Sequence, residues 1–161
     1  VILLAPLSGQ QAESGKAFID GFTLATREQD GHAFEESDGH LGGLDSYLYK
    51  LDSRLPAEKL DSQLKRLIAT EQPTFLTGMP VPDAAQRATA IHGLVQVEPQ
   101  QSEIWKLAET TPDTLTMTDG TDFSRAFERA YQYAPDAAAS RGYIAARLIS
   151  GTVRSMDQNP A

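Results

Sequence analysis

The fold of this chain is decided by Val1-Ile-Leu-Leu-Ala-Pro-Leu-Ser-Gly9, followed by Gly15-Lys-Ala-Phe-Ile-Asp-Gly-Phe-Thr-Leu-Ala25. The first stretch is an apolar run that ends near a proline and a glycine, which is typical of a buried central strand in a parallel sheet. The second has apolar residues at the i, i+4 and i+7 spacing of one helix face. A strand, a tight polar turn and a helix in succession open an α/β domain, and such domains bind ligands at the turn after the strand. Residues 8–15 are therefore expected to face a binding site.

Composition limits the class of protein. The 161 residues, 40% of them hydrophobic, suit one globular domain over residues 1–161. The 22 acidic and 14 basic residues give a net charge of −8, which opposes nucleic-acid backbones and anionic lipid surfaces as partners. Without an apolar stretch of about 18 residues, membrane insertion is not expected. The absence of cysteine excludes disulfides and thiolate catalysis.

Predicted strands and helices alternate along the chain, as in a parallel sheet covered by helices. We expect a three-layer α/β/α sandwich with a five-stranded parallel sheet in flavodoxin-like order. The stretch Asp30–Asp45 is rich in glycine and acidic residues and is predicted to be a loop. After the opening strand, the other predicted strands are Tyr47–Asp52, Thr74–Gly78, Leu94–Val97 and Leu115–Thr118. The predicted helices are Ala12–Gln29, Pro56–Thr70, Asp83–His92, Ser102–Ala108, Asp122–Tyr133 and Asp136–Met156.

Several motifs, taken in chain order, resemble those of one family. They are Leu3-Leu-Ala-Pro-Leu-Ser-Gly9 with Ala12 and Gly15, Asp20-Gly-Phe-x-Leu-Ala25, Leu41-Gly-Gly43 before a strand ending in Asp52, Phe123-x-x-x-Phe127-x-x-x-Tyr131, Ala134-Pro-Asp136, Ala138 and Gly142-Tyr-x-Ala-Ala146. Together they resemble the first lobe of type I periplasmic solute-binding proteins, and most of all the branched-chain amino-acid binding components of ABC transporters. The opening also resembles the related domain of lipoprotein activators of cell-wall synthases.

The resemblance implies a non-catalytic, periplasmic or otherwise exported binding protein without a cofactor or a metal ion. Family members have a second lobe inserted before the segment that returns to the first, whereas here a short connection around residues 100–114 fills that place. A single lobe offers an open face, which a second copy of the chain or a partner chain would complete.

The candidate ligand-binding residues lie on the loops that follow the first, third and fourth predicted strands. They are Ser8, Gly9, Gln10, Ser14, Gly78, Met79, Val81, Gln100, Gln101 and Ser102. The resemblance implies that these loops hold a small molecule at the carboxyl ends of the strands. However, the loop between Gly78 and Asp83 has no serine or threonine, and its two prolines lack N–H groups, so it has few donors for a ligand carboxylate.

Because this loop has few hydrogen-bond donors, a second function stays open, in which a degenerate binding lobe acts as a protein-interaction or regulatory module in the cell envelope. Its partner protein would dock on the strand-end face near Met79 and Trp105. The two hypotheses differ in what they require of that face. Solute binding needs hydrogen-bond donors at the strand ends, and docking needs an exposed apolar patch.

The sequence gives less support to nucleotide binding, metal binding or catalysis than to the two binding functions above. The stretch Gly9–Lys16 has five residues between its glycines and Ala17 after the lysine, whereas a phosphate-binding P-loop needs four residues and then serine or threonine. His32, Glu35, Glu36, Asp38 and His40 include metal-ligand types, but an acidic surface loop explains them more simply. No nucleophile, base and orienting acid can be paired from their order in the chain.

Overall fold

The computed structural model describes residues 1–29, 37–99 and 120–158 of the chain. Within these ranges four strands form a parallel sheet: β1 (Ile2–Ala5), β4 (Tyr49–Asp52), β5 (Phe75–Gly78) and β6 (Val95–Val97). Their spatial order is β4-β1-β5-β6, so the first strand lies between the second and the third in chain order. The flavodoxin-like order is therefore confirmed for these four strands. The predicted fifth strand, Leu115–Thr118, and the predicted helix Ser102–Ala108 lie outside the described residues.

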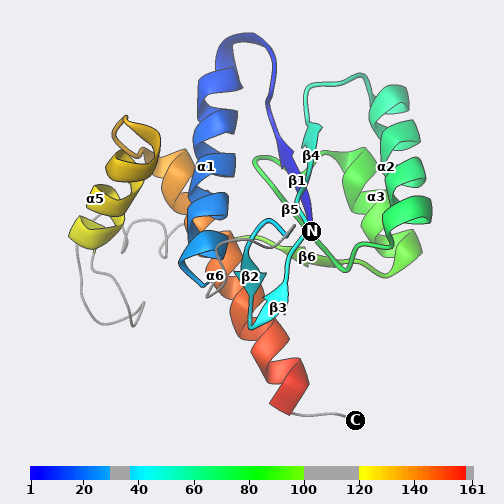
Figure 1. Ribbon diagram of the computed structural model, residues 1–161. Helices are drawn as coiled ribbons and strands as arrows, with labels where there is room; N and C mark the ends of the chain where they lie inside the picture. Colours follow the sequence, from blue (N-terminus) through cyan, green and yellow to red (C-terminus); the bar gives the residue numbers. More distant parts are fainter. Residues whose placement is uncertain (30–36, 100–119, 159–161) are drawn as a thin grey trace.

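Helices cover both faces of the sheet (Figure 1). On one face lie α1 (Ala12–Glu28) and α6 (Ala137–Gln158), with α5 (Gly120–Tyr131) packed outside α1. On the other face lie α2 (Ala57–Glu71) and α3 (Asp83–His92). The three-layer α/β/α arrangement predicted from the sequence is thus confirmed.

The alternation of side chains along β1 divides the core into two clusters. Leu3 and Ala5 are fully buried in the cluster beneath α1 and α6. Ile2 and Leu4 are fully buried in the cluster beneath α2 and α3. Successive side chains of a strand point to opposite faces, so a strand covered on both sides must be apolar throughout. This explains the continuous apolar run at the start of the chain.

The predicted loop Asp30–Asp45 is wrong in its second half, where the structure has an antiparallel hairpin. Its strands are β2 (His40–Leu41) and β3 (Leu44–Asp45), joined by Gly42 and Gly43. Both glycines have a positive φ. The commonest two-residue turn between antiparallel strands requires a positive φ at both of its central residues. The hairpin packs against α6, because a Cβ atom on Gly42 would lie 2.7 Å from Cβ of Val153.

Candidate functional site

The four parallel strands end at the same edge of the sheet, which carries the loops that were expected to bind a ligand. Figure 1 shows the β1–α1 and β4–α2 connections at the top of the molecule. The helix after β1 lies on one face of the sheet and the helix after β5 lies on the other. The chain therefore reverses its winding between β1 and β5, and in α/β folds this is the position at which ligands bind.

Asp52, the last residue of β4, holds the β1–α1 loop in place. Its Oδ2 atom accepts a hydrogen bond from the Ser8 hydroxyl at 2.7 Å, and its Oδ1 atom accepts one from the backbone N–H of Leu7 at 3.0 Å. Oδ1 also accepts a hydrogen bond from the backbone N–H of Arg54 at 2.9 Å. The carboxylate thus connects the ends of the two neighbouring strands, β1 and β4.

These interactions set the protonation state of Asp52. Burial alone would raise the pKa of its carboxyl group. The hydrogen bonds from Leu7, Ser8 and Arg54, together with the positive charge of Arg54, outweigh burial and lower this pKa below its ordinary value. Asp52 is therefore ionised at neutral pH and acts only as an acceptor toward the loop.

The candidate residues of the β1–α1 loop lie where a ligand could reach them. Ser8, Gly9 and Gln10 are exposed, and Ser14 is half-buried in the first turn of α1. Residues Gly9–Gln11 form a short 3-10 turn that leads into α1, and no side chain caps this turn at Ser8. The loop therefore presents the Gln10 amide group and the Ser8 hydroxyl, whose hydrogen is donated to Asp52 and whose oxygen can accept, at the carboxyl edge of the sheet.

The candidate residues of the β5–α3 loop are placed differently. Gly78 is buried, and the half-buried Met79 side chain packs against the core beneath α1 and α6. Val81 is 6% exposed and belongs to the core beneath α2 and α3, while its carbonyl oxygen accepts a hydrogen bond from Nε2 of Gln86 at 3.0 Å. The loop thus contributes its backbone to the edge, rather than the side chains of these two residues.

The remaining candidates, Gln100, Gln101 and Ser102, lie outside the described residues, as do Trp105 and the histidine and glutamates at positions 32, 35 and 36. Of the other residues weighed as metal ligands, Asp38 accepts a hydrogen bond from the backbone N–H of Leu48, and His40 pairs with Asp45. Over the described ranges, no three histidine, aspartate or glutamate side chains gather in a group that could hold a metal ion.

Sequence reasoning did not include the polar residues at the end of β4 among the candidate site residues. In addition to Asp52, the buried Oγ atom of Ser53 has no hydrogen-bond partner among the described residues. Nη1 of Arg54 donates to Oε1 of Gln11 at 3.5 Å, which is a second link between the two loops. Asp52-Ser53-Arg54 lies at the end of a predicted strand, but the sequence does not show that this strand is the neighbour of β1, and that pairing gives these residues their role. A buried hydroxyl without a partner is uncommon in proteins, so Ser53 adds a polar group to this edge that could contact a ligand or water.

The comparisons with known proteins identify the class of fold. The structure is similar to that of an ABC-transporter solute-binding protein from R. palustris, solved in complex with benzoate, with a TM-score of 0.62 and 14% sequence identity. That match covers 96% of this chain and 80% of the other. A second match, at a TM-score of 0.58 and 10% identity, is to an amino-acid ABC-transporter substrate-binding protein from Pseudomonas fluorescens Pf-5 and covers 97% of this chain and 78% of the other.

By sequence, no protein-family model and no curated protein matches the chain. The structural likeness nevertheless confirms the expected class: the chain has the fold of the type I periplasmic solute-binding proteins. The two neighbours are binding proteins rather than enzymes. In the part of the chain that the structure covers, no helix has both the length and the apolar character needed to cross a membrane.

Proposed function

We propose that this chain is a non-catalytic solute-binding domain that holds a small molecule at the carboxyl edge of its sheet, between the β1–α1 and β5–α3 loops. One observation carries the proposal: at the position where the winding reverses, Asp52 fixes a loop whose residues Ser8, Gly9 and Gln10 remain exposed. A loop that is fixed and still accessible can bind a solute without first being ordered, which lowers the entropic cost of binding. Ser14, Gly78, Met79, Val81, Gln100, Gln101 and Ser102 complete the proposed site.

The ligand is proposed to be a small neutral or amino-acid-like molecule. Ser8 and Gln10 offer hydroxyl and amide groups, which suit polar uncharged partners. The resemblance to branched-chain amino-acid binders makes free amino acids the first compounds to test. The backbone N–H of Met79 already donates to the carbonyl oxygen of Leu4 at 2.8 Å, and Pro80 and Pro82 have no N–H group. A free carboxylate would therefore find few donors on the β5–α3 loop, so we expect amides and neutral analogues to bind at least as well.

The proposed domain organisation is a single lobe over residues 1–161, with the connection around residues 100–114 in place of a second lobe. An open face buries less of a ligand than a closed cleft does, so a lone lobe binds weakly. A second copy of the chain or a partner chain would cover the ligand from the other side. The working location that we propose is the periplasm, or another exported setting, as a component of an ABC transporter.

Thermal unfolding tests the proposal, because a ligand that binds only the folded state raises the midpoint. The panel contains amino acids, their amides and small carboxylates including benzoate. At ten times its dissociation constant a ligand adds about 1.4 kcal/mol, which is roughly 3–5 °C for a domain of this size. Ser8→Ala should reduce the shift. The matched control is Ser62→Ala, because the Ser62 hydroxyl is exposed on α2 and donates only to the Glu58 carbonyl in the described contacts. If no compound of the panel raises the unfolding midpoint, the proposed solute binding is wrong.

A second candidate is a degenerate lobe that docks a partner protein on the strand-end face. The packing of Met79 and Val81 in the core takes these two side chains away from the apolar patch that docking needs, so this candidate rests on the small number of donors on the β5–α3 loop. A photo-crosslinking residue at the exposed position Gln10 should then give one discrete adduct in envelope extracts. The same residue at the exposed position Lys65 on α2 should give none. Adducts that are equal at both positions would contradict a specific docking face.

A further inference from the structure

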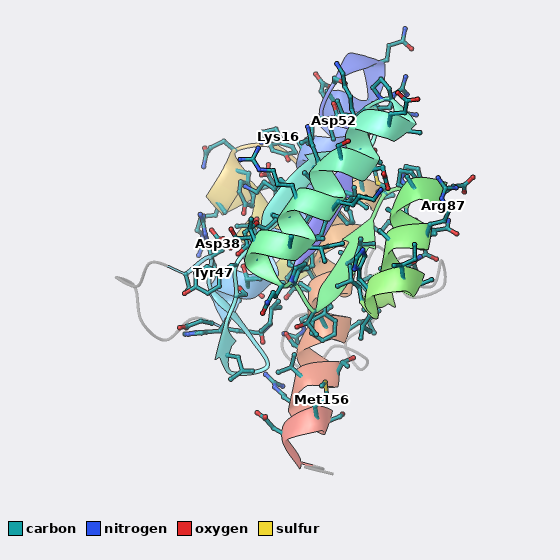
Figure 2. All side chains as sticks on the ribbon, turned by 90° about the vertical axis from the view of Figure 1, so that its right-hand side faces the viewer. Lys16, Asp38, Tyr47, Asp52, Arg87 and Met156 are labelled. Atoms are coloured by element: carbon teal, nitrogen blue, oxygen red, sulfur yellow. The ribbon has the colours of Figure 1, made fainter. Side chains whose placement is uncertain are left out.

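A cavity with a volume of about 230 Å³ lies at the edge of the sheet where the parallel strands begin, opposite the edge that carries the proposed solute site. The hairpin β2–β3, the C-terminal end of α2, the beginnings of β4 and β5 and the C-terminal half of α6 line it. Figure 2 shows Asp52 toward the upper end of the molecule, with Tyr47, which lines this cavity, lower down. We propose that the cavity is a binding site for a small hydrophobic amine. This proposal is independent of the proposed function, because the two sites lie at opposite edges of the sheet.

The floor of the cavity is apolar and part of its rim is unusually exposed. Leu41, Phe75 and Ile149 are buried in the core beneath α1 and α6 and form the floor. At the rim Leu44 is 54% exposed and Tyr47 is 50% exposed. Large apolar side chains gathered at the mouth of a cavity favour an occupant that covers them, because covering them removes apolar surface from water. The apolar part of a ligand would fill this space.

The charges around the cavity select a cation. Its lining contains the carboxylates of Asp45 and Glu71 and, among the described residues, no lysine or arginine. The net charge of −8 for the whole chain also attracts cations at long range.

The C-terminal end of α2 adds to the preference of the cavity for a cation. The helix finishes at Glu71, which lines the cavity, and no basic side chain occupies its last turn. The C-terminal end of a helix carries a partial negative charge from its unpaired carbonyl groups, and a cation placed there is stabilised. A protein commonly supplies this cation from its own lysine or arginine. In α2 the last turn has no such side chain, and a bound amine would supply this cation.

Two tyrosines prepare the cavity for an ammonium group. The Tyr49 hydroxyl donates to Oε2 of Glu71 at 3.0 Å, which holds this carboxylate at the wall of the cavity. On the hairpin side, Asp45 is held by Nε2 of His40 at 2.8 Å. The ring of Tyr47 is accessible, and a cation over the face of such a ring is attracted by its electrons. Oriented carboxylates, aromatic rings and an apolar floor together fit an amine that carries an aryl or alkyl group.

Titration of the full chain with benzylamine, followed by NMR of the backbone amides, tests the proposal. The amide signals of residues 44–47, 71, 72, 74 and 75 should shift, while those of residues 7–11 at the carboxyl edge should not. Benzyl alcohol has a similar shape without the charge and should bind about tenfold more weakly, the loss expected for a charge-assisted hydrogen bond. Equal binding of the amine and the alcohol would overturn the proposal, as would the absence of shifts at about 10 mM amine.

Three variants test whether benzylamine binds in this cavity. Glu71→Gln should weaken benzylamine binding about tenfold, because it removes the charge and keeps the side-chain shape. Glu58→Gln makes the same change in the first turn of α2, away from the cavity, and should leave binding unchanged. Leu44→Ser changes an exposed rim residue without disturbing the core and should also weaken binding. Equal affinities in the Glu71→Gln and Glu58→Gln variants would show that only the overall charge matters and would reject the site.

Discussion

The carboxylate of Asp52 and the hydroxyl of Ser8 are joined by a hydrogen bond of 2.7 Å, although the two residues are 44 positions apart in the chain. The bond connects the end of β4 to the loop after β1. These strands are neighbours, with Ala5 paired to Asp52 in the sheet register. The geometry of the proposed solute site therefore depends on an ionised side chain from a strand that contributes no candidate ligand residue of its own.

Replacing Asp52 with alanine should destabilise the domain and loosen the β1–α1 loop. The change leaves the donors of Leu7, Ser8 and Arg54 without their shared acceptor. Because water can replace part of these contacts at this edge, we expect a loss of about 2 kcal/mol in the free energy of unfolding, measured by urea denaturation. Ser8→Ala removes only one of the three hydrogen bonds and should cost about 1 kcal/mol. An equal loss in both variants would contradict the central role of Asp52.

The same carboxylate should make stability depend on acid pH. Its pKa in the folded state lies below the ordinary value of 3.8, so folding favours the ionised form. This contribution is fully present above pH 3.8 and is lost as the pH falls through the lower pKa of the folded protein. The difference in unfolding free energy between the native protein and Asp52→Asn should therefore shrink between pH 7 and pH values below 3.8. A difference that stays constant over this range would show that the ionisation of Asp52 does not stabilise the fold.

The sequence predicts the regular elements well where local signals and burial agree. The helix predicted at Asp83–His92 has these same bounds in the structure, since Pro82 precedes it and Gly93, with a positive φ, follows it. The hairpin at residues 40–45 was missed because its composition is that of a loop. Its strands are two residues long and are held by contacts to α6, more than 100 positions later in the chain. A pattern of local residues does not report such contacts.

The candidate site residues also divide into those whose placement follows from the local sequence and those whose placement depends on how the strands and loops pack. The exposure of Ser8, Gly9 and Gln10 agrees with their expected place after a buried strand. The burial of Val81 was not expected, because it depends on how the loop after β5 turns toward α3. Asp52 was missed for a related reason. Its role comes from the pairing of β4 with β1, and the sequence alone does not say which strands are neighbours.

Gly142→Ala should destabilise the domain strongly, because α1 and α6 pack too closely at this point for a side chain. A Cβ atom on Gly142 would lie 1.9 Å from the backbone carbonyl oxygen of Phe18, so the two helices would have to separate. We expect a loss of about 3 kcal/mol or more in thermal or urea unfolding. Gly151→Ala, on the same helix, is the control. A Cβ atom there meets nothing within 4 Å, and the higher helix propensity of alanine should add up to about 1 kcal/mol. Equal effects at both positions would contradict the tight crossing.

Tyr133→Phe should weaken the attachment of the segment after α5 to α1 and change the response to alkaline pH. The Tyr133 hydroxyl donates to Oδ2 of Asp20 at 2.7 Å, and Nζ of Lys16 lies 4.7 Å from the centre of the Tyr133 ring. Burial raises the pKa of Tyr133 above its ordinary value of 10.0, and the hydrogen bond to Asp20 raises it further. The neutral hydroxyl therefore stabilises the fold fully below pH 10.0, and this contribution is lost as the pH rises above that value toward the pKa of the folded protein. Phenylalanine should lower the free energy of unfolding by about 1 kcal/mol at pH 7, and the deficit should narrow above pH 10.0 when urea midpoints are compared. A deficit that is equal at both pH values would show that the hydroxyl contributes through packing rather than through its proton.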